Sequence, residues 1–272
     1  MTDNCRVSTV MMRRLLVMVI CAAVATVAGC GGGTSSPSSS EQAAPAAAAA
    51  VADPVDSATA GHVTGTVTFA GTPPKPAAVA MDSDPICKPE GGAATDETVL
   101  VGNGGSLQNV FVYVKDGLGS LRFPVAPTAV RLDQKGCSYA PHVLGIQVGQ
   151  TLEIVNSDTT LHNVHALAVD NREFNMGQPL AGMKTTHTFS TKEVMVPFKC
   201  DVHGWMRAYI GVLDHPYFAV TGPDGSFDLK RLPPGTYTIE AWHERLGTQT
   251  QSVTIGAGET GKVAFSFKRP AT

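Results

Sequence analysis

Side chains that bind soft metals gather in one short stretch of this sequence. Cys200, His203 and Met206 are spaced as CxxHxxM, and His162 lies well upstream, after an Asn-Ser-Asp turn. Thiolate and thioether ligands favour Cu(I), whereas imidazoles also accommodate Cu(II), so this set suits a copper ion that cycles between the two states. The sequence therefore predicts one mononuclear copper site formed by these four side chains.

Strands must carry these side chains to one place. Residues 151–156 alternate between apolar and polar side chains and lead to His162, and residues 193–198 lead to Cys200. A further alternating segment, 207–213, leaves the second loop. A period of two is typical of a half-buried strand. We therefore expect an all-β fold in which two loops at one end of a β-sandwich meet at the metal.

The ligand spacing resembles that of the cupredoxins, the small blue copper proteins, and is most similar to the amicyanin type, in which His-Asn-Val-His precedes a tight Cys, His, Met loop. The resemblance covers roughly residues 130–213. It implies a Greek-key β-sandwich with one type 1 copper bound by His162, Cys200, His203 and Met206. The alternative is a sandwich of the same fold without a metal.

The same resemblance implies roles for neighbouring residues. Asn163 matches the family's Asn whose side chain ties the two ligand loops together and whose backbone amide points at the thiolate. His203 corresponds to the ligand whose ring edge reaches the surface, and Trp205 beside it would belong to an apolar patch where a redox partner protein docks.

The remaining histidines are more simply explained as surface or hydrogen-bonded residues. His165 is harder to place, because its odd separation from His162 puts the two rings on opposite faces of an extended segment. The others are His62, His142, His187, His215 and His243.

Strand signals outside this region predict a second sandwich. Alternation begins at residue 61, a strand is expected over 107–114, and Asp-Gly-Ser-Phe and Leu-Pro-Pro-Gly-Thr-Tyr segments come late. These segments resemble the carboxypeptidase regulatory-like (transthyretin-like) β-sandwich. We expect this sandwich to be split over 61–120 and 215–269, with the cupredoxin domain over 121–214 inserted. The alternative is two successive sandwiches.

The N-terminus is typical of an export signal. Two arginines precede an apolar run that ends in Val-Ala-Gly-Cys30, so residues 1–29 are expected to be a signal peptide. The junction resembles a bacterial lipobox, which implies a lipid on Cys30 and a protein anchored to a bacterial membrane in the periplasm or at the cell surface. A plain secretory signal is the alternative. Residues 30–60 lack large apolar side chains and are expected to form a disordered tether.

Cysteine use fits an oxidising compartment. Once the signal, lipid and metal cysteines are assigned, Cys87 and Cys137 remain, and we expect a disulfide between them. Two free buried thiols are the alternative, because sequence alone does not establish connectivity.

These features favour a membrane-tethered one-electron carrier. The alternatives are a copper storage or delivery protein and a non-redox surface binding lipoprotein. A net charge of −3 gives no basis for nucleic-acid binding. We expect no enzyme. In multicopper oxidases and copper nitrite reductases a His next to the ligand Cys connects it to a second copper, whereas the neighbours of Cys200 are Lys199 and Asp201. His243-Glu244 lacks the second His of HExxH, so a zinc peptidase is not supported.

Overall fold

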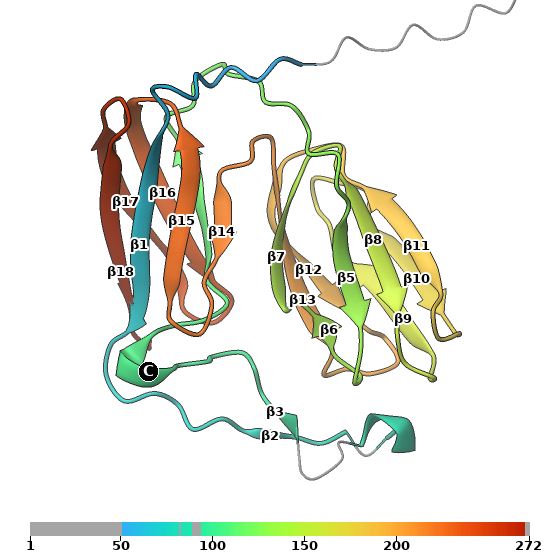
Figure 1. The fold of residues 1–272 in the computed structure, drawn as a ribbon. Coiled ribbons are helices and arrows are strands. Elements are labelled where there is room, and N and C mark those ends of the chain that lie inside the picture. The colour runs from blue at the N-terminus through green and yellow to red at the C-terminus, as the bar shows by residue number, and fades with distance from the viewer. Residues whose placement is uncertain (1–50, 82, 89–93, 270–272) are drawn as a thin grey trace, which may run out of the picture. The chain divides into compact units, whose positions relative to one another are not determined.

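Alternating apolar and polar residues form the strands of this chain, and the fold is all-β. The computed structural model describes residues 51–81, 83–88 and 94–269. The expected signal peptide, the lipidation site at Cys30 and residues 31–50 of the expected tether lie outside the described residues. Ala49–Thr272 forms one unit that holds all the strands (Figure 1). In the described part of the chain no helix has the length and apolar character needed to cross a membrane.

The first group of strands, here called the split sandwich, uses residues from both ends of the described chain. One sheet has the order β15-β1-β18, and the other has the order β14-β4-β16-β17. The strands are β1 (Gly61–Phe69), β4 (Phe111–Asp116), β14 (Phe218–Val220), β15 (Ser226–Leu232), β16 (Gly235–His243), β17 (Gly247–Ile255) and β18 (Thr260–Phe267). Strand β1 pairs antiparallel with β15 and parallel with β18.

The second group, here called the inserted sandwich, is contiguous in sequence and lies between β4 and β14. Its sheets have the orders β10-β9-β12-β13-β7 and β11-β8-β5-β6. The strands are β5 (Val130–Gln134), β6 (Tyr139–Ala140), β7 (Val143–Gln147), β8 (Thr151–Asn156), β9 (His162–Ala166), β10 (Phe174–Gln178), β11 (Lys184–Thr188), β12 (Glu193–Lys199) and β13 (Arg207–Leu213).

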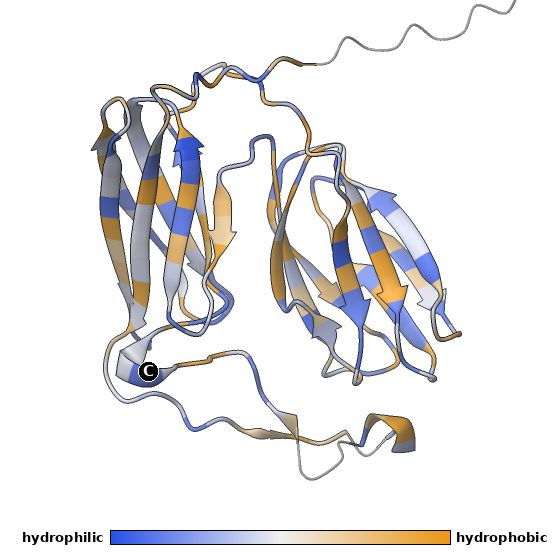
Figure 2. Ribbon diagram, viewed as in Figure 1, coloured by the Kyte–Doolittle hydropathy of each residue, from blue (hydrophilic) through white to orange (hydrophobic). Residues whose placement is uncertain are grey.

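Each sandwich encloses its own apolar core. Val63 of β1 and Ile239 of β16 are buried in one cluster, whereas Ile154 of β8 and Ile210 of β13 are buried in another. The alternation that produces these buried faces is visible as bands of opposite hydropathy along the strands in Figure 2. Burial of such side chains contributes about 1.5–3 kcal/mol each.

A third apolar cluster joins strands of the two groups. The ring of Phe111 from β4 packs where Gly211 and Gly145 carry no side chain, and a Cβ at Gly211 would lie 2.3 Å from that ring. Tyr209 and Trp242 lie beside it, with ring centroids 5.0 Å apart. The two glycines therefore allow an aromatic side chain to approach the backbone of the inserted sandwich.

The segment between β1 and β4 contains little regular structure. It holds β2 (Ala78–Val79), β3 (Ala94–Thr95) and two short 3-10 helices, η1 (Pro85–Cys87) and η2 (Asn103–Gly105). We call its described residues 78–81, 83–88 and 94–95 the cap segment. Cys87 forms a disulfide with Cys137 of the inserted sandwich, across a sequence separation of 50. The expected pair is thus present in the structure, and Cys200 is unpaired.

Residues 51–60 differ from the expected tether. Val55 packs against the core of the split sandwich, Arg231 Nη2 lies 2.9 Å from Asp53 Oδ2, and the Gly258 amide donates to Thr59 O at 2.9 Å. The segment has few apolar side chains, so its sequence does not indicate that Val55 and Asp53 contact the split sandwich.

Candidate metal centre

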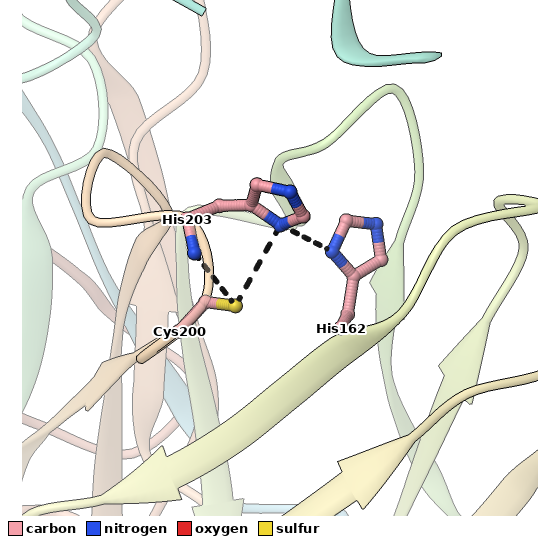
Figure 3. A group of neighbouring side chains, drawn as sticks. All are labelled: His162, Cys200 and His203. Atoms are coloured by element: carbon pink, nitrogen blue, oxygen red, sulfur yellow. Dashed lines mark hydrogen bonds between the residues drawn. The ribbon is translucent and has the colours of Figure 1, made fainter. Parts of the chain in front are cut away.

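Three of the predicted ligands converge at one end of the inserted sandwich (Figure 3). His162 Nδ1 lies 3.0 Å from His203 Nδ1, and His203 Nδ1 lies 3.9 Å from Cys200 Sγ. One donor atom from each of the three residues lies within 4.8 Å of the others. All three side chains are buried.

Local backbone geometry brings the donors to this end. His162 opens β9, directly after a turn in which Asn156 accepts from the Asp158 amide at 2.9 Å. Cys200 follows the last residue of β12, and its amide donates to Met206 O at 3.2 Å, while the Met206 amide donates to His203 O at 2.9 Å. The CxxHxxM stretch is therefore a closed loop between β12 and β13, whose chain ends are held by sheet pairing.

Two backbone amides point at the sulfur of Cys200. The His203 amide lies 3.3 Å from Sγ and the Asn163 amide lies 3.4 Å from it. Amides in this position stabilise negative charge on the sulfur, the form in which Cys binds a metal. The Asn163 side chain accepts from the Asp201 amide at 2.5 Å and donates to Asn175, so it links the two ligand loops.

Each imidazole contacts a carboxylate at its outer nitrogen. His162 Nε2 lies 2.9 Å from Asp158 Oδ2, and His203 Nε2 lies 3.3 Å from Asp84 Oδ2. Carboxylates in this position hold a ligand ring in one orientation and one tautomer. Burial alone would raise the pKa of Asp158, but hydrogen bonds from the Cys137 amide and from His162 hold that pKa below its usual value. Burial lowers the pKa of His162 in turn.

This arrangement fits a bound cation. When both outer nitrogens donate to carboxylates, each neutral ring keeps a bare lone pair on Nδ1. The two Nδ1 atoms then face each other at 3.0 Å. Two lone pairs at that distance repel unless a metal ion or a proton lies between or beside them. With a cysteine sulfur alongside, the donor chemistry fits copper.

Met206 belongs to the same buried environment. Its side chain is 1% exposed and lies in the apolar cluster that also contains Cys200 and Phe198. A thioether in this cluster can serve as the weak soft ligand that the sequence predicts. The surrounding apolar side chains exclude water from the centre.

The expectation that His203 reaches the surface is wrong. His203 is 2% exposed, because Asp84 and Cys87 of the cap segment lie against its outer nitrogen, with Cys87 Sγ at 3.6 Å. Trp205 lies beside it, with ring centroids 5.1 Å apart, and its indole N–H donates to Cys137 O at 3.0 Å. The cap segment therefore covers the edge that the cupredoxin resemblance placed in solvent.

The other predicted residue near the site faces away from it. His165 contacts Asp201 at 2.9 Å and Glu173 at 2.7 Å, consistent with its odd separation from His162 along β9. Sequence reasoning missed Asp84, Asp158 and Tyr139, whose hydroxyl donates to Asn163 O at 2.5 Å. Asp158 lies in the Asn-Ser-Asp turn, four residues before His162, and this short separation could have indicated its contact with the ring.

Comparison with solved structures finds copper proteins. Cu-containing nitrite reductase (NirK) from Thermus scotoductus SA-01 is 23% identical, with a TM-score of 0.31, and the match covers 37% of this chain and 26% of that protein. A purple cupredoxin from Nitrosopumilus maritimus is 24% identical over 30% of this chain and 98% of its own, with a TM-score of 0.26. A reduced mutant of amicyanin is 27% identical over 32% of this chain and 85% of its own, with a TM-score of 0.29.

The structural neighbours of this chain are cupredoxins. The matches span about a third of the chain, and the chain covers about a quarter of the nitrite reductase. The family model for polysaccharide lyase family 4, domain II, a fibronectin type III-like domain, matches residues 188–263. The search of curated proteins gives no match.

Proposed function

We propose that this protein is a type 1 copper protein that carries single electrons outside the cytoplasm. One observation carries the proposal: the Nδ1 atoms of His162 and His203 lie 3.0 Å apart, beside the sulfur of Cys200 and away from solvent. Copper would supply the one-electron couple. His162, Cys200, His203 and Met206 would hold it.

The chain's own residues perform the remaining tasks. The amides of Asn163 and His203 donate to the sulfur of Cys200 and stabilise negative charge on it. The carboxylates of Asp158 and Asp84 fix the orientation of the two imidazole rings. Ligands that are fixed before the metal binds change little between oxidation states, which favours fast electron transfer. The buried position of the site supports retention of the ion over the storage and delivery alternative.

Membrane tethering through a lipid on Cys30 and a partner docking near His203 and Trp205 belong to the same proposal. The apolar run that ends at Cys30 supports the anchor. A partner at this end of the sandwich would meet the cap segment before His203, because Ile86 beside Cys87 is 54% exposed whereas His203 is buried.

The test is to add Cu(II) to purified Ala49–Thr272. We expect an intense visible charge-transfer band from thiolate to copper, a reversible one-electron potential and slow loss of copper to a chelator. Cys200→Ser should remove the band while leaving the unfolding transition of the metal-free protein in place. A colourless copper complex would contradict the type 1 assignment, and rapid exchange of copper would favour storage or delivery.

A further inference from the structure

Asp84 reaches the candidate centre from outside the inserted sandwich. It lies on the cap segment, between β1 and β4 of the split sandwich, yet its Oδ2 lies 3.3 Å from His203 Nε2. The sulfur of the disulfide-bonded Cys87 lies 3.6 Å from the same nitrogen of His203. A residue remote in sequence from the ligand loops thus contacts the outer edge of a ligand ring.

Three contacts hold Asp84 in place. Thr160 Oγ1 donates to its Oδ2 at 2.6 Å, the Ile86 amide donates to its Oδ1 at 2.9 Å, and the disulfide of Cys87 fixes the chain three residues later. Both carboxylate oxygens of Asp84 therefore have a hydrogen-bond donor within the protein, which fixes the side chain. Thr160 lies in the turn before His162, so this carboxylate links the two ligand loops through the cap segment.

A fixed carboxylate at this position acts on the ligand ring in two ways. As an acceptor from Nε2–H it fixes the ring orientation and leaves Nδ1 free for the metal. As a negative charge behind the ligand it stabilises a divalent ion more than a monovalent ion. Burial of the imidazole at 2% exposure limits screening by water on that side.

We propose that Asp84 is a positioning residue of the copper centre, which fixes His203 through Nε2 and biases the centre towards Cu(II). This inference rests on the proposed function. Asp158 supplies the matching contact for His162 from within the inserted sandwich. The cap segment therefore contributes part of the electrostatic environment of the metal.

The chain offers a matched control. Asp96 also accepts from the amide two residues later, Thr98, at 2.8 Å, and it lies next to β3 of the cap segment. Among the described residues, its hydrogen-bond partners do not include an imidazole. Asp84→Asn and Asp96→Asn therefore make the same chemical change in the same type of turn. The contacts with His203 and Thr160 distinguish Asp84 from Asp96.

The experiment measures the reduction potential of copper-loaded Ala49–Thr272 and its variants. We expect Asp84→Asn to lower the ratio of Cu(II) to Cu(I) affinity about tenfold, which raises the potential by about 59 mV for one electron. Asp96→Asn should leave the potential unchanged, and Asp84→Glu, which restores the charge, should return it towards the wild-type value. An unchanged or lowered potential in Asp84→Asn, or an equal rise in Asp96→Asn, would overturn the proposal.

A second readout needs no copper. In the metal-free protein, long-range ¹H–¹⁵N spectra should show His203 as an Nε2–H ring in wild type and a mobile ring with averaged signals in Asp84→Ala. Unchanged His203 signals in that variant would overturn the positioning role. If the wild type forms no blue centre, the proposed function fails, and this measurement still decides the role of Asp84.

Discussion

Both imidazoles of the candidate centre are fixed from two sides. Each outer nitrogen contacts a carboxylate, and the backbone that carries each ring takes part in hydrogen bonds to the sulfur of Cys200 or to the Met206 loop. Asn163 links these elements, because its side chain accepts from the Asp201 amide while its own amide points at the sulfur.

At the residue scale, Asn163→Ala should weaken this link. The change removes a buried acceptor and leaves the Asp201 amide without its partner, which costs about 1–3 kcal/mol. We expect that loss in urea unfolding of the metal-free protein, with the blue band retained because the backbone amide stays. Leu161→Ala, at a 43% exposed neighbour in the same loop, should change stability by less than about 0.5 kcal/mol. Equal stability of both variants would contradict the role given to the Asn163 side chain.

The proximity of His162, Cys200 and His203 could be predicted from sequence, because the types and spacing of these residues are local properties of one loop and one turn. The partners of the rings could not. Asp84 lies in a segment without periodicity, and only the tertiary structure brings it to His203. For the same reason the exposure expected for His203 was wrong. Ligand types are set by short-range sequence, whereas coverage of a site depends on a remote segment.

At the element scale, the cap segment is tied to the inserted sandwich by one covalent bond. Its strands β2 and β3 pair only with each other in the described part of the chain, and η1 is a single short helix. Such a segment has little hydrogen bonding of its own, so the disulfide and the contacts of Asp84 with Thr160 and His203 attach it to the inserted sandwich.

Removal of the disulfide should therefore loosen the cap. For a loop of 50 residues the chain-entropy estimate for the bond is about 4 kcal/mol. We expect Cys87→Ser/Cys137→Ser to lose stability of that order in chemical unfolding and to release copper to a chelator faster. If the chelator removes copper from this double variant at the wild-type rate, the cap does not protect the centre.

Strand positions followed the sequence closely where alternation was regular, as in β8 and β13. The strand expected over 107–114 is instead Phe111–Asp116, because Asn109 has a φ of 58°, which interrupts the extended backbone. A single residue in the left-handed region is not visible to a pattern of hydropathy. Strand β4 pairs with β14 and β16, so its partners come from the far end of the chain.

At the scale of the whole molecule, two buried histidines make stability depend on pH. Burial lowers the pKa of His215 and that of His243 to about 4 each. In both rings Nδ1 accepts a backbone amide, from Tyr217 at 3.2 Å and from Arg245 at 3.1 Å, so each ring must be neutral to keep its bond.

The sign follows from comparison with the unfolded chain. Between pH 6.5 and pH 4 the unfolded chain binds more protons at these residues, so stability falls as the pH falls through this window and is complete above it. From pH 7 to pH 5 we expect a loss of about 2 kcal/mol per histidine. Urea unfolding at pH 7 and pH 5 measures it, and His215→Asn/His243→Asn, which retains an acceptor, should show a smaller loss. The same loss in the double variant would assign the effect to other groups.

The connectivity of the strands implies an order in which the parts of the chain fold. Strand β1 is made early, but its neighbours β15 and β18 follow the whole inserted sandwich, and the register His62↔Thr260 joins residues almost two hundred positions apart. Long-range pairings of this kind form late. The inserted sandwich, which is contiguous in sequence, can therefore fold first. The edges of β1 stay unpaired until β15 and β18 have formed. During this interval the exposed edges of β1 are most open to wrong pairing.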